Sequence, residues 1–142
     1  MNKSIWSVSK NALVASALLV GVVGCANKKP DPMDSVSGVI VKPDHMKLSP
    51  AAVAHVRLAD VTDGFVKSET VVETKIRPSE DGTIPFALSF KESRIDKSRK
   101  YAVDVRVVDR HNVYVVGGKQ YPVLTKGHGD TVEVQLDRGS KF

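Results

Sequence analysis

The sequence predicts an all-β protein, a single antiparallel β-sandwich of about seven to eight strands, behind an N-terminal export segment. Two observations predict the sandwich. Apolar and polar residues after Ser35 alternate with a period of two, the pattern of a strand with one buried face. Clusters of glycine, proline, asparagine and aspartate separate the alternating stretches at short intervals, as turns between strands do. A closed eight-stranded barrel of the same strands is the alternative.

Three stretches show the alternation most clearly. Each has an apolar side, which we expect to face the core, and a polar or small side, which we expect to face solvent. The expected inward residues are Ile84, Phe86, Leu88 and Phe90, then Tyr101, Val103, Val105 and Val107, and finally Val132, Val134 and Leu136.

Other stretches complete the expected sandwich. We expect further strands at 36–42, 53–61, 70–76, 112–117 and 121–124. Single helical turns are expected at 92–95 and 50–53. Asp104 and Arg106 share the polar face of one strand, so we also expect an ordinary surface ion pair between them.

The front of the chain has the layout of a secretory signal. Lys3 and Lys10 precede about a dozen apolar or small residues that end at Gly24. A membrane-spanning helix needs about 20 consecutive apolar residues, and this run is shorter and rich in glycine. We therefore expect residues 1–24 to be a cleaved signal peptide.

The residues Val22, Val23, Gly24 and Cys25 resemble the lipobox of bacterial lipoproteins. That resemblance implies a diacylglyceryl group on the thiol of Cys25, cleavage before Cys25 and acylation of the new amine. It also implies outer-membrane placement facing the periplasm, because Ala26 stands where an aspartate would favour the inner membrane. The chain has one cysteine, so it can form no internal disulfide, and lipidation would account for that cysteine.

The remaining chain divides into a tether and a domain. Residues 25–35 contain the cysteine, two prolines and little apolar content, and we expect a flexible tether that reaches at most about 35 Å. Residues 36–142 form the expected β-sandwich domain. Cleavage would remove Lys3 and Lys10 and no acid, which lowers the formal charge from +5 to +3. This mild charge is scattered among acids, so we expect no nucleic-acid partner.

Four consecutive apolar residues break the alternation at Val113, Tyr114, Val115 and Val116. In a strand with one buried face, two of the four must point outward, and either register is possible. Exposed apolar residues can mark a partner site, so these four are the candidate partner surface. The other interpretation is that a loop or residues 120–125 cover them. Val71 and Val72 raise the same question in a weaker form.

We find no pattern of catalysis or of metal binding. His128 and Asp130 lie close in sequence, but a metal site needs three or four ligands and no second cluster is visible. No glycine-flanked serine nucleophile occurs, and the carboxylates fit solvated strand faces. We therefore expect no enzyme activity, no metal and no cofactor beyond the covalent lipid on Cys25.

Several phrases of the domain, taken in order, are similar to the YbaY/YscW lipoprotein family. They are Val36-Ser37-Gly38, Leu48 to Val61, Ile84 to Phe90, Arg94-Ile95-Asp96, Tyr101-Ala102-Val103 and Tyr121 to Thr125. The resemblance implies a β-sandwich, an acylated N-terminus and no catalysis. It further implies either a pilotin that binds a secretin or another envelope-assembly subunit, or a general envelope lipoprotein of uncertain role. For a general envelope lipoprotein, the alternative function is binding of a small apolar ligand, lipid or glycan.

Overall fold

The computed structural model describes residues 29–79, 83–110, 112–115 and 119–137. The predicted signal peptide lies outside the described residues, as do the lipobox residues Val22, Val23 and Gly24 and the predicted lipidation site Cys25. One residue of the candidate partner surface, Val116, also lies outside them.

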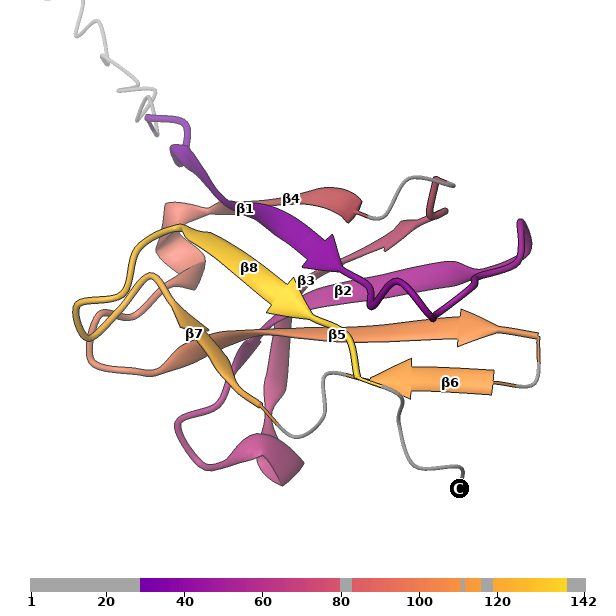
Figure 1. Ribbon diagram of the computed structural model, residues 1–142. Coiled ribbons are helices and arrows are strands. Elements are labelled where there is room, and N and C mark those ends of the chain that lie inside the picture. The colour runs from indigo at the N-terminus through magenta and orange to yellow at the C-terminus, as the bar shows by residue number, and fades with distance from the viewer. Residues whose placement is uncertain (1–28, 80–82, 111, 116–118, 138–142) are drawn as a thin grey trace, which may run out of the picture.

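Within the described residues, eight strands form two sheets that pack face to face (Figure 1), so the predicted all-β sandwich is confirmed. One sheet has the order β4-β1-β8, and the other has the order β3-β2-β5-β6, with β7 also paired to β5. The strands are β1 (Met33–Val41), β2 (Val53–Asp60), β3 (Glu69–Ile76), β4 (Thr83–Lys91), β5 (Tyr101–Asp109), β6 (Asn112–Val115), β7 (Tyr121–Val123) and β8 (Thr131–Gln135).

The first strand starts earlier than the apolar alternation predicts. β1 begins at Met33 rather than at Val36, and Met33 lies opposite Lys91 at the end of β4. Residues 33–35, which we expected in the tether, therefore pair with β4. The reason is that strand pairing uses backbone groups, so these residues need no apolar side chain to join the sheet.

Among the described strands one pair is parallel, whereas the sequence predicts antiparallel pairing throughout. β1 and β8 run side by side in the same direction, with Gly38 opposite Val132. A Cβ atom on Gly38 would lie 2.0 Å from the carbonyl oxygen of Val132 and 2.9 Å from the ring of Phe86. The absence of a side chain at Gly38 therefore permits the close approach of β8.

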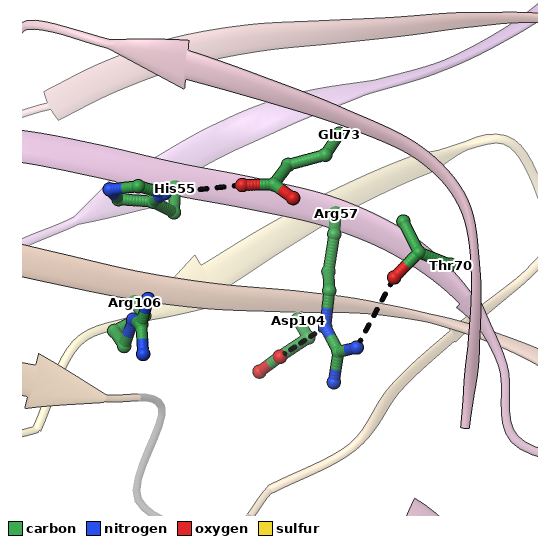
Figure 2. Close-up of a pocket in the computed structure, with 6 residues that line it drawn as sticks. All are labelled: His55, Arg57, Thr70, Glu73, Asp104 and Arg106. Atoms are coloured by element: carbon green, nitrogen blue, oxygen red, sulfur yellow. Dashed lines mark hydrogen bonds and ion pairs between the residues drawn. The ribbon is translucent and has the colours of Figure 1, made fainter. Parts of the chain in front are cut away.

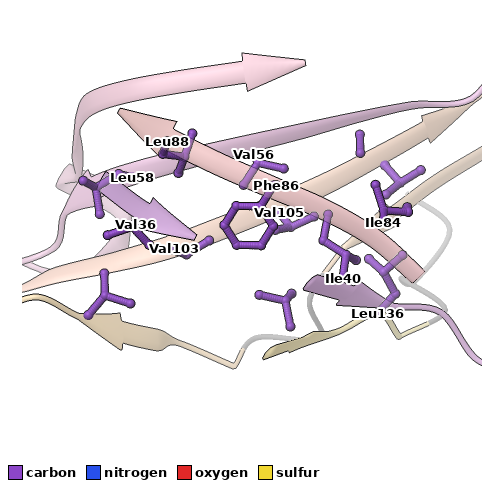
Figure 3. Close-up of a cluster of buried hydrophobic side chains, with 14 of the residues drawn as sticks. Val36, Ile40, Val56, Leu58, Ile84, Phe86, Leu88, Val103, Val105 and Leu136 are labelled. Atoms are coloured by element: carbon purple, nitrogen blue, oxygen red, sulfur yellow. The ribbon is translucent and has the colours of Figure 1, made fainter. Parts of the chain in front are cut away.

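The core lies between the two sheets (Figure 3). The expected inward residues of β4 and β5 are all buried, each with an exposed fraction of 6% or less. Of the inward residues expected in and after β8, Val134 and Leu136 are buried, and Val132 is partly buried against the same core. The predicted alternation thus identifies the inward faces of these strands correctly.

Short turns connect the strands. A 3-10 turn at Glu92–Arg94 matches the expected helical turn after β4. A second 3-10 turn at Phe65–Lys67 was not expected. The expected helical turn at 50–53 is instead a single hydrogen-bonded turn, in which the Ala52 N–H donates to the Ser49 carbonyl. Among the described residues, no helix has the length and apolar character to cross a membrane.

Candidate interaction surface

Three valines lie in register across the outer face of the larger sheet. Val108 in β5 is opposite Val53 in β2 and opposite Val113 in β6. Their chain neighbours Ala54 and Val107 are completely buried, so Val53 and Val108 point to the other face of the sheet. Val113 is 43% exposed. We call Val53, Val108 and Val113 the valine row.

The structure resolves the register of the predicted partner surface. Val113 faces outward, and Tyr114 packs against the core from the edge of the sheet. Val115 lies in β6 opposite Arg106. Sequence reasoning found Val113 but missed Val53 and Val108, because these residues become neighbours only through strand pairing. The adjacent apolar pairs 53–54 and 107–108 were the available signal.

A β-bulge accounts for the other apolar pair, Val71 and Val72. Leu58 is opposite Val72 and Ala59 is opposite Thr70, so Val71 has no residue opposite it in β2. Such a bulge bends the strand locally. Both valines are half-buried and pack against the core, so this pair does not add to the outer apolar surface.

A polar groove of about 280 Å³, whose lining residues are shown in Figure 2, lies beside the valine row. His55 and Arg106 line it, and they share the sheet face of Val53 and Val108, because each lies two residues from one of these valines. The charges of the groove are largely paired. His55 Nδ1 lies 3.1 Å from Glu73 Oε1, and Arg57 Nε donates to Asp104 Oδ2 at 2.7 Å. The residues that line it are His55, Arg57, Thr70, Glu73, Asp104 and Arg106.

The predicted ion pair between Asp104 and Arg106 is wrong, because the carboxylate of Asp104 pairs with Arg57 instead. Asp104 and Arg57 are directly opposite in adjacent strands, and such cross-strand neighbours lie closer than residues two apart on one strand. Arg57 also lies over the ring of Phe65, with its guanidinium carbon 5.7 Å from the ring centroid. Arg106 forms no ion pair with any other described residue and is exposed.

A row of basic residues adjoins the valine row on the same sheet face. His55 is opposite Lys75 in β3 and opposite Arg106 in β5. His55 follows Val53 by two residues and Arg106 precedes Val108 by two, so this basic row is the next row along the strands. The outer face therefore presents apolar side chains at its end and basic side chains beside them.

The groups with shifted pKa values lie outside the polar groove, and each shift has a local cause. The hydroxyl of Ser49 lowers the pKa of Asp109, and Ser98 lowers that of Asp96. Burial would raise the pKa of Asp60, but bonds from Thr62 and Arg99 outweigh it, so that pKa is also lowered. Among the residues that the structure describes, no three His, Cys, Asp or Glu side chains gather as a metal site would need.

The protein is therefore a small β-sandwich module, and the outer face of its larger sheet carries both apolar and basic side chains. Residues 31–136 match the family model of YscW, the type III secretion system lipoprotein chaperone. The chain belongs to this family, which confirms the resemblance seen in the sequence.

A solved structure shares the fold. It is the structure of an alternative pilotin from the type II secretion system of Vibrio cholerae, with a TM-score of 0.67 and 19% sequence identity. The similarity covers 74% of this chain and 96% of that one. No curated protein matches the chain.

Proposed function

We propose that this protein is a non-enzymatic, pilotin-like chaperone that binds a secretin subunit at the outer membrane. Membership of the lipoprotein chaperone family supports the pilotin-like role. The proposal adds three elements: a lipid on Cys25, a secretin as partner, and the valine row with its basic neighbours as the binding surface. The observation that carries the surface is the alignment of Val53, Val108 and Val113 on a solvent-facing sheet.

The geometry of the valine row favours an amphipathic helix as the bound segment. Adjacent strands lie about 4.8 Å apart, so the three valines span about 10 Å across the sheet. Apolar residues at positions i, i+3 or i+4, and i+7 of a helix span about 10 Å along its axis. A secretin helix laid across β2, β5 and β6 could therefore place its apolar stripe on the valine row.

The basic row predicts the charge of that helix. Arg106 and Lys75 are exposed, and Arg106 forms no ion pair with another described residue. Acidic side chains beside the apolar stripe of the partner would lie next to these cations. Complementary charges of this kind fix orientation and speed association more than they add affinity.

The lipid would supply location. One acyl chain anchors a protein only marginally, whereas two or more hold it firmly. A domain that grips a secretin while its acyl chains sit in the outer membrane raises the effective concentration of the secretin at that membrane. No catalytic step is needed for this role.

The test of this proposal is a fractionation of cells that produce the full chain. We expect the wild-type protein in the outer-membrane fraction, with an intact mass that includes the lipid, and the secretin in the same fraction. The Cys25→Ser variant should leave the outer-membrane fraction and reduce the secretin there. A Cys25→Ser protein that stays in the outer membrane, or a wild-type protein with an unmodified thiol, would contradict the proposal.

A further inference from the structure

The folded domain begins closer to Cys25 than the sequence indicates. The carboxylate of Asp31 accepts hydrogen bonds from the backbone N–H and the hydroxyl of Ser93. The N–H of Glu92 donates to the carbonyl of Pro32 at 2.9 Å. The chain is therefore held from Asp31 onward, and residues 26–30 alone connect it to Cys25. Five residues reach at most about 18 Å, half the reach that the sequence predicts.

Three loops share the end of the sandwich at which this connection enters. β1, β3, β5 and β8 begin at this end, and β2, β4 and β7 finish there (Figure 1). The loops are 61–68, 92–100 and 124–130. We call this region the tether end. It is physically continuous, because the Ser37 N–H donates to the Asp130 carbonyl at 2.9 Å, and Asp34, Glu92 and Thr125 line one cavity of about 310 Å³.

A second cavity at the tether end, of about 450 Å³, is basic. Lys100, Lys126 and His128 line it, and none of its described lining residues is acidic. Outside the lining, Asp60 and Asp63 share the single guanidinium of Arg99, and the charges of Arg99 and Lys126 help to lower the pKa of Asp96. The cavity itself presents two lysines and a histidine together with the hydroxyl-bearing residues Thr62 and Thr125. We call it the basic pocket.

The loop that carries Lys126 and His128 is held in an unusual shape. Leu124 and Lys126 have φ angles of 67° and 58°, in the left-handed region that residues with side chains rarely adopt. Several bonds enforce this shape. Leu124 N–H donates to the Gly129 carbonyl at 2.8 Å, and the Thr125 hydroxyl donates to the Arg99 carbonyl at 2.8 Å. Backbone strain that surrounding contacts enforce is concentrated at functional sites.

The tether end also exposes apolar side chains. Val66 is completely exposed and Phe65 is 37% exposed, and both lie on the loop that supplies Thr62 and Gly64 to the basic pocket. An exposed apolar tip next to basic side chains is the combination that interfacial membrane contacts use. No described residue of the chain covers the side chain of Val66.

We infer that the tether end rests on the bilayer, with the phosphate of an anionic phospholipid in the basic pocket and Val66 in the headgroup region. This inference rests on the proposed lipid at Cys25, which would hold the tether end within about 18 Å of the membrane. Asp63, Glu92, Asp96 and Asp130 lie on the same loops, so the tether end as a whole is mixed in charge, and the anionic group would bind where the lining has no acid. The valine row lies at the opposite end of β2 and β5, where a partner can reach it.

The test compares the acylated full chain in nanodiscs of phosphatidylcholine alone and in discs that also contain phosphatidylglycerol. Amide hydrogen exchange is measured for residues 61–68 and 124–130. We expect exchange in both loops to slow by about threefold or more when phosphatidylglycerol is present. Equal exchange in the two kinds of disc would overturn the inference. Equal slowing by inorganic phosphate in phosphatidylcholine discs would also overturn it, because the pocket would then not select a lipid.

Matched variants connect the effect to the pocket. Lys100→Gln/Lys126→Gln should abolish the slowing by phosphatidylglycerol. Lys47→Gln/Arg77→Gln removes the same charge from exposed positions outside the pocket and should retain the slowing. If both double variants lose it equally, the pocket is not the site. The intact mass of each sample separates the two proposals. An unmodified Cys25 would overturn the anchor and this inference together, whereas a lipidated chain with equal exchange would overturn this inference alone.

Discussion

The hydroxyl and the backbone N–H of Ser49 both donate hydrogen bonds to the carboxylate of Asp109, which lies 60 residues further along the chain. Asp109 is 6% exposed and ends β5 directly after Val108. The contact therefore fastens the loop before β2 to the end of β5. It closes the core at the end of the sandwich that carries the valine row.

Replacing Ser49 tests the strength of that contact. Ser49→Ala leaves one oxygen of a buried carboxylate without its hydroxyl donor, so we expect the free energy of unfolding to fall by about 1 to 3 kcal/mol. Urea unfolding at neutral pH measures the change. The control is Ser89→Ala, which alters an exposed serine on β4 and should be nearly neutral. Equal losses in the two variants would show that the contact with Asp109 contributes nothing.

The same carboxylate predicts a dependence of stability on acid. The bond from the Ser49 hydroxyl lowers the pKa of Asp109 in the folded protein, although burial opposes this shift. A lowered folded pKa gives stabilisation that is complete above the unfolded pKa of about 4. That stabilisation is lost as the pH falls through the folded pKa.

We therefore expect the free energy of unfolding to decrease below about pH 4, and to decrease less in Asp109→Asn than in the wild type. Denaturant titrations at a series of pH values measure how steeply the free energy of unfolding depends on pH in each of the two proteins. A smaller acid dependence remains in the variant, because the pKa of Asp60 is also lowered. Identical slopes in the wild type and Asp109→Asn would remove Asp109 from this explanation.

Gly38 tests the parallel pairing of β1 with β8. A methyl group at Gly38 would meet the backbone oxygen of Val132, which cannot rotate away as a side chain could. We expect Gly38→Ala to lower the free energy of unfolding by about 3 kcal/mol and to loosen β8. Amide exchange in 131–135 reports the loosening. Gly129→Ala is the matched control, because no atom lies within 4 Å of the Cβ that it would add. If Gly38→Ala is as stable as this control, the strands do not approach as closely as described.

The strands could be located from the sequence, because an alternation of apolar and polar residues with a period of two shows which residues lie on the buried face of a strand. Ile84 and Val105 could be placed inside on that basis alone. The same alternation says nothing of which strands become neighbours, so the parallel β1–β8 pair and the Arg57–Asp104 contact were missed. The valine row was missed for the same reason, because Val53 and Val108 are distant in sequence and meet only through the pairing of β2 with β5.

Arg106 tests whether the basic row orients the partner. Its side chain is exposed and forms no ion pair with another described residue. We expect Arg106→Glu to change the free energy of unfolding by less than about 0.5 kcal/mol. Its affinity for the secretin should fall several-fold, because an attractive charge becomes repulsive. Lys47→Glu makes the same charge change on an exposed loop residue and should bind normally. Equal affinities of the two variants would exclude the basic row from the binding surface.

The most direct measurement of the proposed role is the amount of secretin that co-purifies with the full chain from solubilised outer membranes, identified and quantified by mass spectrometry. We predict that the wild type retains the secretin. Val113→Asp should lose at least about tenfold while its unfolding midpoint stays close to that of the wild type, because Val113 is a surface residue on an edge strand. A wild-type chain that retains no secretin, or a folded Val113→Asp chain that retains as much as the wild type, would contradict the account.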